Sequence, residues 1–154
     1  MGDPACMEGR YAVRIVVRSY ELDLNGHVNH ANYHRYGEHS RTEHMSAAGC
    51  SMSRMVENGM GIVLLETHCR FLNELRYRDV VDVESRLRFG EGKTFEFEHT
   101  LRRRGRDGAE NGENVVAAEI TCRMGLLDSN ARRLLSEPRK RLLELATEPV
   151  LLGG

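Results

Sequence analysis

Residues 10–21 alternate between apolar and polar side chains in a pattern typical of a β-strand with one buried face. The apolar members are Tyr11, Val13, Ile15 and Val17. In a strand, such alternation places every apolar side chain on the same face. We therefore predict an N-terminal strand over this range, with its second face open to solvent.

The pattern changes after Gly26, where the apolar repeat lengthens from two residues to three or four. Asn29 or Asn32 can cap a helix here, and Gly49 can end it about four to five turns later. The predicted inward stripe consists of Tyr33, Tyr36, Gly37, Ser40, His44 and Ala47. This stripe is small and polar, whereas an ordinary core helix is rich in Leu and Ile. A buried helix with such a face indicates a functional role.

Most of the remaining chain is predicted to be β-structure. Four stretches alternate for much of their length, namely residues 62–72, 79–89, 94–103 and 114–127. Because such alternation is typical of strands with one buried face, it predicts four antiparallel strands. A short turn at 90–93 and a longer polar loop at 105–114 are predicted to join them as hairpins.

Shorter segments complete the predicted domain. Residues 51–58 form a short helix or an irregular loop, and Pro138 suits the first turn of a C-terminal helix. Residues 1–9 and 149–154 are predicted to be tails, so that one domain spans residues 10–148.

The predicted fold class is α+β, with a sheet of about five strands wrapped around one long helix. An antiparallel sheet with one covered face needs an apolar element against that face, and the long helix provides it. The open edge of the sheet can pair with the same edge of another copy. We therefore predict a homodimer or a homotetramer.

Composition narrows the range of partners. The 22 basic residues are balanced by 23 acidic ones, so the chain lacks the positive charge that neutralises a nucleic acid backbone. The longest apolar run, residues 62–65, is far shorter than the roughly 18 residues of a membrane helix. The four cysteines include no CxxC pair, which favours reduced thiols in the cytoplasm. These features argue against nucleic acid and membrane partners.

The segment Asp23–Tyr33 concentrates the candidate chemistry. Within eleven residues it holds one carboxylate, a turn glycine, three amides, two imidazoles and a phenol. A purely structural loop has no need of this combination. The segment also lies directly before and within the start of the predicted long helix, where free backbone N–H groups are expected.

These residues carry a resemblance to a known family. The sequence from Asp23 to Tyr36, followed by Phe71 and then by Tyr77-x-Asp79, resembles the hotdog-fold thioesterases of the 4-hydroxybenzoyl-CoA thioesterase type. The likeness covers about residues 10–128. The segment Tyr20–Asn29, together with the later Arg41, is most similar to the stand-alone thioesterases of enediyne polyketide biosynthesis.

The resemblance implies an acyl thioester as substrate and gives two residues catalytic roles. By position in the family motif, the backbone N–H of His30 is the principal donor to the oxyanion that develops on the thioester carbonyl. This agrees with the fixed positive end of a helix dipole. Asp23, six or seven residues upstream, can act as nucleophile or as general base for water. An ordinary loop or capping role for Asp23 remains the alternative, with Glu38 and Glu43 as reserve carboxylates.

Four further residues are candidates for positioning the substrate. Asn29, Asn32 and Tyr33 can hold the loop and the thioester group by hydrogen bonds, or they can simply cap the helix and pack in the core. Arg41 stands in the middle of a helix expected to be largely buried, where a cation needs a partner. It can therefore anchor Asp23 or a substrate carbonyl, and we count it among the catalytic residues.

Other catalytic patterns find little support, and we predict no cofactor and no metal. His30 and His34 are four residues apart, but there is no HExxH motif and no carboxylate that completes a ligand set. Gly92-Lys93-Thr94 resembles the end of a P-loop without the required earlier glycine. A G-x-S-x-G nucleophile elbow is also absent from the sequence.

The acyl chain is expected to run between the helix and the sheet or along the dimer seam. Residues suited to line its path are Met45, Met52, Met55, Met60 and Leu64, because methionine adapts to irregular shapes. The phosphopantetheine arm would approach near Arg86, Arg88 and Lys93. An acyl carrier protein is the predicted carrier, and the alternatives are an acyl-CoA thioesterase of general metabolism or a non-catalytic protein that binds acyl thioesters.

Overall fold

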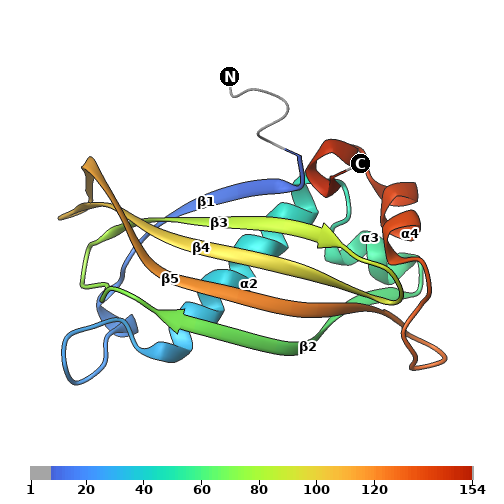
Figure 1. Ribbon diagram of the computed structural model, residues 1–154, viewed down its shortest axis with the longest axis horizontal. Coiled ribbons are helices and arrows are strands. Elements are labelled where there is room, and N and C mark those ends of the chain that lie inside the picture. Colours follow the sequence, from blue (N-terminus) through green and yellow to red (C-terminus); the bar gives the residue numbers. More distant parts are fainter. Residues whose placement is uncertain (1–7, 154) are drawn as a thin grey trace.

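The computed structural model describes residues 8–153, in which one antiparallel sheet curves around one long helix (Figure 1). The helices are α2 (His30–Ala47), α3 (Met52–Glu57) and α4 (Pro138–Leu145), and 3-10 turns cover Ser19–Glu21 and Pro149–Leu152. The strands are β1 (Arg10–Val16), β2 (Met60–Phe71), β3 (Val80–Phe89), β4 (Thr94–Arg106) and β5 (Ala109–Asp128). They pair in the order β1-β3-β4-β5-β2, and each neighbouring pair is antiparallel. The predicted α+β fold is confirmed.

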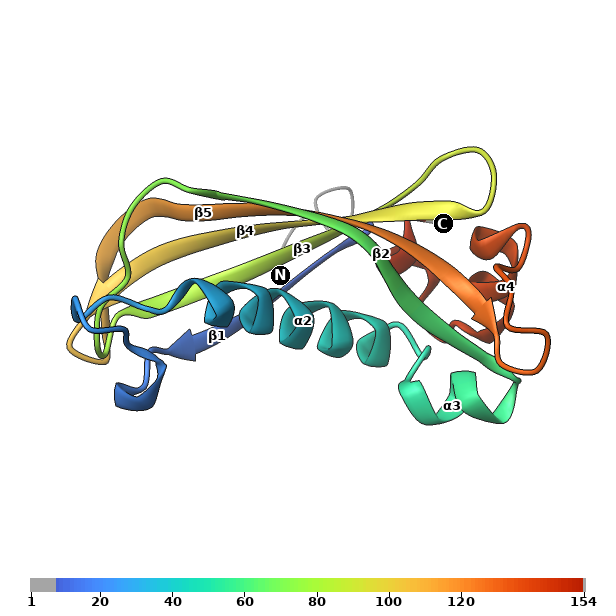
Figure 2. The ribbon, with the colours of Figure 1, turned by 90° about the horizontal axis from the view of Figure 1, so that it is seen from below.

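Helix α2 lies along the concave side of the sheet (Figure 2). Its buried residues include Tyr33, Tyr36, Gly37, Ser40 and His44, which confirms most of the predicted inward stripe. The polar members are satisfied by the surrounding chain, because the Ser40 hydroxyl donates to the Val83 carbonyl oxygen at 2.9 Å. Both ring nitrogens of His44 also have partners, the Ser85 hydroxyl and the Leu151 carbonyl oxygen. The stripe therefore joins the helix to the sheet through hydrogen bonds as well as through apolar packing.

The predicted polar loop at residues 105–114 is wrong, because β4 and β5 continue through most of it as a long hairpin. The two strands are joined by a turn at Asp107 and Gly108, both of which have positive φ angles. An Asp-Gly turn with two positive φ angles matches the right-handed twist of the flanking strands. An ion pair of 2.7 Å between Arg103 on β4 and Glu113 on β5 joins the two strands across this hairpin.

The predicted C-terminal tail is also wrong for Pro149–Leu152, which packs on the domain. Leu151 and Leu152 are buried, and the Leu151 carbonyl oxygen accepts a hydrogen bond from His44 at 2.6 Å. Gly9, the last residue of the predicted N-terminal tail, donates its N–H to the Val150 carbonyl oxygen at 2.8 Å. Residues 1–7 of that tail lie outside the described residues.

Three cysteines fall in the described part of the chain, and all three are free thiols. Cys50 and Cys122 are buried and Cys69 is half-buried, whereas Cys6 lies outside the described residues. Burial raises the pKa of the Cys50 and Cys69 thiols, which makes them less reactive. Over residues 8–153, the helices are too short or too polar to cross a membrane.

Replacing Gly49 by Ala is expected to destabilise the fold by about 2 kcal/mol or more. Gly49 has a φ of +93°, and an added Cβ would lie 2.6 Å from the backbone nitrogen of Thr147. The Ala48 carbonyl oxygen accepts hydrogen bonds from the N–H groups of Thr147, at 2.9 Å, and Glu148, at 3.1 Å, so the helix end and the C-terminal segment are held together here. Urea denaturation of the variant should show a lower midpoint than the native protein.

The matched control is Gly90→Ala. Gly90 has an ordinary φ, and a Cβ at this position would meet no atom within 4 Å. This substitution should leave the urea midpoint almost unchanged. Equal midpoints for the two variants would show that the contact at Gly49 is not needed for stability.

Candidate active site

Asp23 lies on the loop that leads into α2 and is held in one orientation. Its Oδ1 atom accepts hydrogen bonds from the backbone N–H groups of Asn25, at 2.8 Å, and of His27, at 3.2 Å. Gly26, with a φ of +75°, allows the tight turn between them. The Oδ2 atom accepts no hydrogen bond from any described residue. One carboxylate oxygen therefore closes the loop and the other is left available.

The start of α2 offers a free backbone donor beside this loop. The Asn29 side chain caps the helix by accepting from the Ala31 N–H at 3.0 Å, and the Asn32 N–H donates to the Asn29 carbonyl oxygen at 2.9 Å. His30 is the first helical residue, so its N–H has no acceptor within the helix. No other described residue supplies one. The N–H that we predicted as oxyanion donor is therefore unpaired within residues 8–153, and its role in binding an oxyanion stays a prediction.

Asn32 and Tyr33 fix the helix start in place. Asn32 is buried, and its amide donates to the Glu21 carbonyl oxygen at 2.9 Å. The Tyr33 ring packs edge-on against Phe71 with a centroid separation of 5.0 Å, and burial raises the pKa of its hydroxyl. Asn29 therefore caps the helix, and Asn32 and Tyr33 pack in the interior, as the structural alternative predicted. Contact of these three residues with a substrate stays a prediction.

Arg41 does not meet Asp23 within one chain, so this predicted contact is wrong for a single copy. Arg41 follows His30 by eleven residues, which places it about 16 Å further along the helix. Its guanidinium instead lies 4.0 Å from the Cys122 sulfur. Of the described acidic residues, none forms an ion pair with it. Among residues 8–153, Arg41 is thus a half-buried cation without a charged partner.

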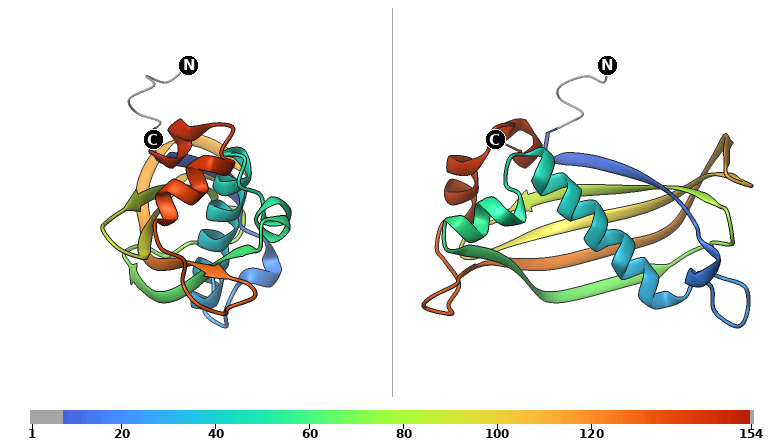
Figure 3. Two further views of the ribbon diagram at one scale, coloured as in Figure 1. Left: turned by 90° about the vertical axis from the view of Figure 1, so that its right-hand side faces the viewer. Right: turned by 180° about the vertical axis from the view of Figure 1, so that it is seen from behind.

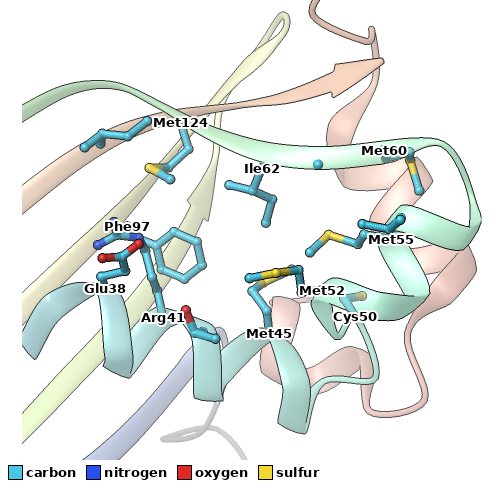
Figure 4. Close-up of a pocket in the computed structure, with 14 residues that line it drawn as sticks. Glu38, Arg41, Met45, Cys50, Met52, Met55, Met60, Ile62, Phe97 and Met124 are labelled. Carbon is cyan, nitrogen blue, oxygen red and sulfur yellow. The ribbon is translucent and has the colours of Figure 1, made fainter. Parts of the chain in front are cut away.

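A cavity of about 370 Å³ lies between the second half of α2, α3 and the start of β2 (Figure 4). Apolar residues on its wall include Met45, Met52, Met55, Met60, Met124 and Phe97. The wall thus includes all five methionines of residues 8–153. Arg41 and the exposed Glu38 also line it, and α3 and α4 cluster at the same end of the sheet (Figure 3). The cavity is suited to a long apolar group that carries some polarity at one end.

Four of these methionines and Leu64 are the residues predicted to line the path of an acyl chain, and they do line this cavity, whereas Met124 was missed. Met124 lies on β5 and alternates with the buried Ile120 and Cys122. This two-residue repeat in the sequence could have placed Met124 on the buried face of its strand. Of the residues suggested for the phosphopantetheine arm, Arg88 already pairs with Glu98 at 2.8 Å.

Comparison with known proteins identifies the family of the chain. A family model described as the thioesterase-like superfamily matches residues 17–146. A chloroplastic acyl-acyl carrier protein thioesterase of Arabidopsis thaliana is 32% identical over 91 residues, which cover 59% of this chain and 48% of that protein. The chain spans 43% to 66% of the length of the curated relatives that it matches.

Solved structures extend the likeness to most of the chain. A protein from Aquifex aeolicus is 28% identical with a TM-score of 0.71, covering 87% of this chain and 98% of its own. A 4-hydroxybenzoyl-CoA thioesterase has a TM-score of 0.77 at 18% identity, and the match covers 90% of this chain and 99% of that one. That second likeness confirms the predicted fold. This chain therefore belongs to the thioesterase-like superfamily and has the hotdog fold of its thioester hydrolases.

Proposed function

We propose that this protein hydrolyses the thioester of an acyl or polyketide chain and releases the free acid. The observation that carries this proposal is the junction between the Asp23 loop and α2. There, the unpaired N–H of His30 and the available Oδ2 of Asp23 lie on adjoining segments of the chain. The N–H is suited to bind an oxyanion, and the carboxylate is suited to attack a carbonyl carbon or to activate water. The methionine-lined cavity provides an apolar environment for the chain.

The proposed reaction begins when the thioester carbonyl oxygen accepts a hydrogen bond from the His30 N–H. The Asp23 carboxylate then attacks the carbonyl carbon directly, or removes a proton from an attacking water. The carbon–sulfur bond breaks and the sulfur leaves as a thiol after taking up a proton. In the direct route, water hydrolyses the resulting mixed anhydride, so both routes consume one water and yield one acid. The loop and the helix start are held in position by Asn29, Asn32 and Tyr33. We propose that these three side chains also contact the thioester.

The proposed assembly is a homodimer, or a homotetramer built from it, joined along β2. This strand forms one edge of the sheet and, within the described residues, pairs only with β5. Leu64, Leu65, Phe71 and Leu72 on or directly after it are exposed although they are large and apolar. A second copy would cover them. In such an assembly, we propose that Arg41 of one copy binds a substrate oxygen in the site formed by Asp23 of the other.

Mixing two inactive variants tests this arrangement. When Asp23→Asn and Arg41→Ala chains are unfolded together and refolded, a mixed dimer contains one site in which both residues are native. Random pairing makes about half of the dimers mixed, so activity should recover to roughly one quarter of the native value. Thiol release before and after mixing measures this recovery. No recovery would indicate that Asp23 and Arg41 act within the same chain.

The proposed substrate carrier is an acyl carrier protein of an enediyne-type iterative polyketide synthase in the cytoplasm. This follows from the likeness of the segment 20–29 and of Arg41 to the thioesterases of that pathway. A matched relative named as an acyl-acyl carrier protein thioesterase supports a protein-bound carrier. The alternative carrier is coenzyme A, which would make the protein an acyl-CoA thioesterase of general metabolism.

A panel of thioesters tests the activity and the carrier together. Each acyl chain is offered both on an acyl carrier protein and on coenzyme A, and thiol release is followed at several concentrations. We expect hydrolysis of long chains, with a kcat/KM at least tenfold higher on the carrier protein. Equal values would favour coenzyme A. Binding of a non-hydrolysable acyl thioester without turnover of any substrate would instead indicate a binding protein.

A further inference from the structure

His99 is a buried polar residue beneath the middle of α2. It belongs to the inward face of β4, in the row Phe95, Phe97, His99 and Leu101. Its exposed fraction is 1%, and neither ring nitrogen has a hydrogen-bond partner within residues 8–153. A buried imidazole without partners is unfavourable, because it has lost its contacts with water and gained none in return. Such a group calls for an explanation beyond packing.

Gly37 on α2 makes room for this imidazole. A Cβ at position 37 would lie 3.2 Å from the Cδ2 atom of His99 and 3.5 Å from the Cδ1 atom of Ile120. Glycine in the middle of a helix weakens it relative to alanine. The chain therefore combines two locally unfavourable residues to place one polar ring under the helix. Departures of this kind from local rules are expected at functional sites.

The His99 ring stays neutral over the whole working range of pH. Burial, followed by the nearby charge of Arg41, lowers its pKa to about 3. The nearby Glu84 carbonyl oxygen acts on the His99 pKa in the opposite direction, although it forms no hydrogen bond with either ring nitrogen. A neutral imidazole has one N–H donor and one nitrogen acceptor. Both are therefore available to a hydroxyl or carbonyl group.

The ring lies directly behind the wall of the methionine-lined cavity. Phe97 lines that cavity and stacks parallel to His99, with centroids 6.0 Å apart. Arg41 also lines it, one helical turn after Gly37, and is close enough for its charge to act on His99. A half-buried cation on the cavity wall and a buried neutral imidazole behind Phe97 of that wall therefore lie near each other, and neither ring nitrogen of the imidazole has a hydrogen-bond partner within residues 8–153.

We propose that His99 and Arg41 form a polar subsite that selects acyl chains carrying an additional oxygen, as a hydroxyl or keto group. The inference rests on the proposed thioesterase function and names the substrate class of that site. An oxygen at this position accepts from the Arg41 guanidinium, while the His99 ring donates to a keto group or accepts from a hydroxyl. A plain hydrocarbon chain offers neither group an oxygen to bind, and it therefore binds less well.

The test compares chains of one length that differ only in oxygen. A hexadecanoyl thioester is measured beside a series in which a hydroxyl or keto group is moved along the chain. The native protein should prefer one oxygenated position over the plain chain by about tenfold or more in kcat/KM. His99→Phe keeps the ring volume but removes both nitrogens, so this ratio should fall to about one. His99→Gln, which can still donate and accept, should retain part of the preference.

The control is Leu101→Met on the same strand, which conserves volume in the core beneath α2 and should keep both activity and preference. A native protein with no preferred position, or a preference that survives His99→Phe, would overturn the inference while leaving the thioesterase proposal intact. If the native protein hydrolyses no thioester, the same comparison is made by calorimetric titration with plain and oxygenated hexadecanoic acids. Equal affinities there would overturn the subsite independently of turnover.

Discussion

Replacing Asp23 by Asn is expected to lower kcat for thioester hydrolysis by about a hundredfold or more. Asparagine keeps an oxygen that can accept from the backbone N–H groups of Asn25 and His27, so the loop should hold its shape. The substitution removes the negative charge that attack or proton removal requires. KM should change little, because the cavity and the helix start are unaltered. Thiol release under saturating substrate measures the effect.

Asp128→Asn is the matched control for this prediction. The Asp128 carboxylate also accepts from two backbone N–H groups, those of Asn130 at 2.9 Å and Ala131 at 3.0 Å. It lies near the end of β5, outside the proposed site, and its substitution should leave kcat unchanged. If Asp23→Asn behaves like this control, Asp23 serves only to close its loop. Catalysis would then rest on the His30 N–H and on positioning.

Periodicity made the architecture predictable because the sheet has one buried face and the helix has one buried stripe. The boundaries were harder to predict. The predicted strand over residues 10–21 is too long, because the apolar alternation ends at Val17 and Ser19–Glu21 form a 3-10 turn instead. At residues 105–114, polar composition masked a hairpin whose Asp107-Gly108 turn was readable in the sequence.

The candidate site was predictable only where it is local in sequence. Asp23 and His30 belong to one loop and the helix that follows it, so a shared site could be proposed from their spacing. The relation of Arg41 to Asp23 could not, since the length of α2 places the two residues at different ends of the helix axis within one chain. His99 escaped notice among seven histidines, although its alternation with Phe95 and Phe97 placed it on the buried face.

Acidification from pH 6.5 to 4.5 is expected to destabilise the fold strongly through His44 and His99. Burial lowers the pKa of both rings in the folded state, that of His99 to about 3. In the unfolded chain, both titrate near 6.5. Below that pH the unfolded state binds more protons, so stability is complete above about pH 6.5 and is lost as the pH falls. If unfolding takes up one to two protons, the free energy of unfolding falls by about 1.4 to 2.7 kcal/mol for each pH unit of acidification.

Urea denaturation at pH 7.0, 6.0, 5.0 and 4.5 measures this slope. The carboxylates with lowered pKa values, such as Glu110 and Glu113, have an ordinary value of 4.5 and therefore contribute mainly below this window. His99→Phe removes one of the two titrating rings, so it should reduce the slope by about 1.4 kcal/mol per pH unit. It should also raise stability at low pH, because it no longer buries an unpaired polar ring. A slope that is the same in both proteins would mean that His99 binds its proton equally well in the folded and unfolded states.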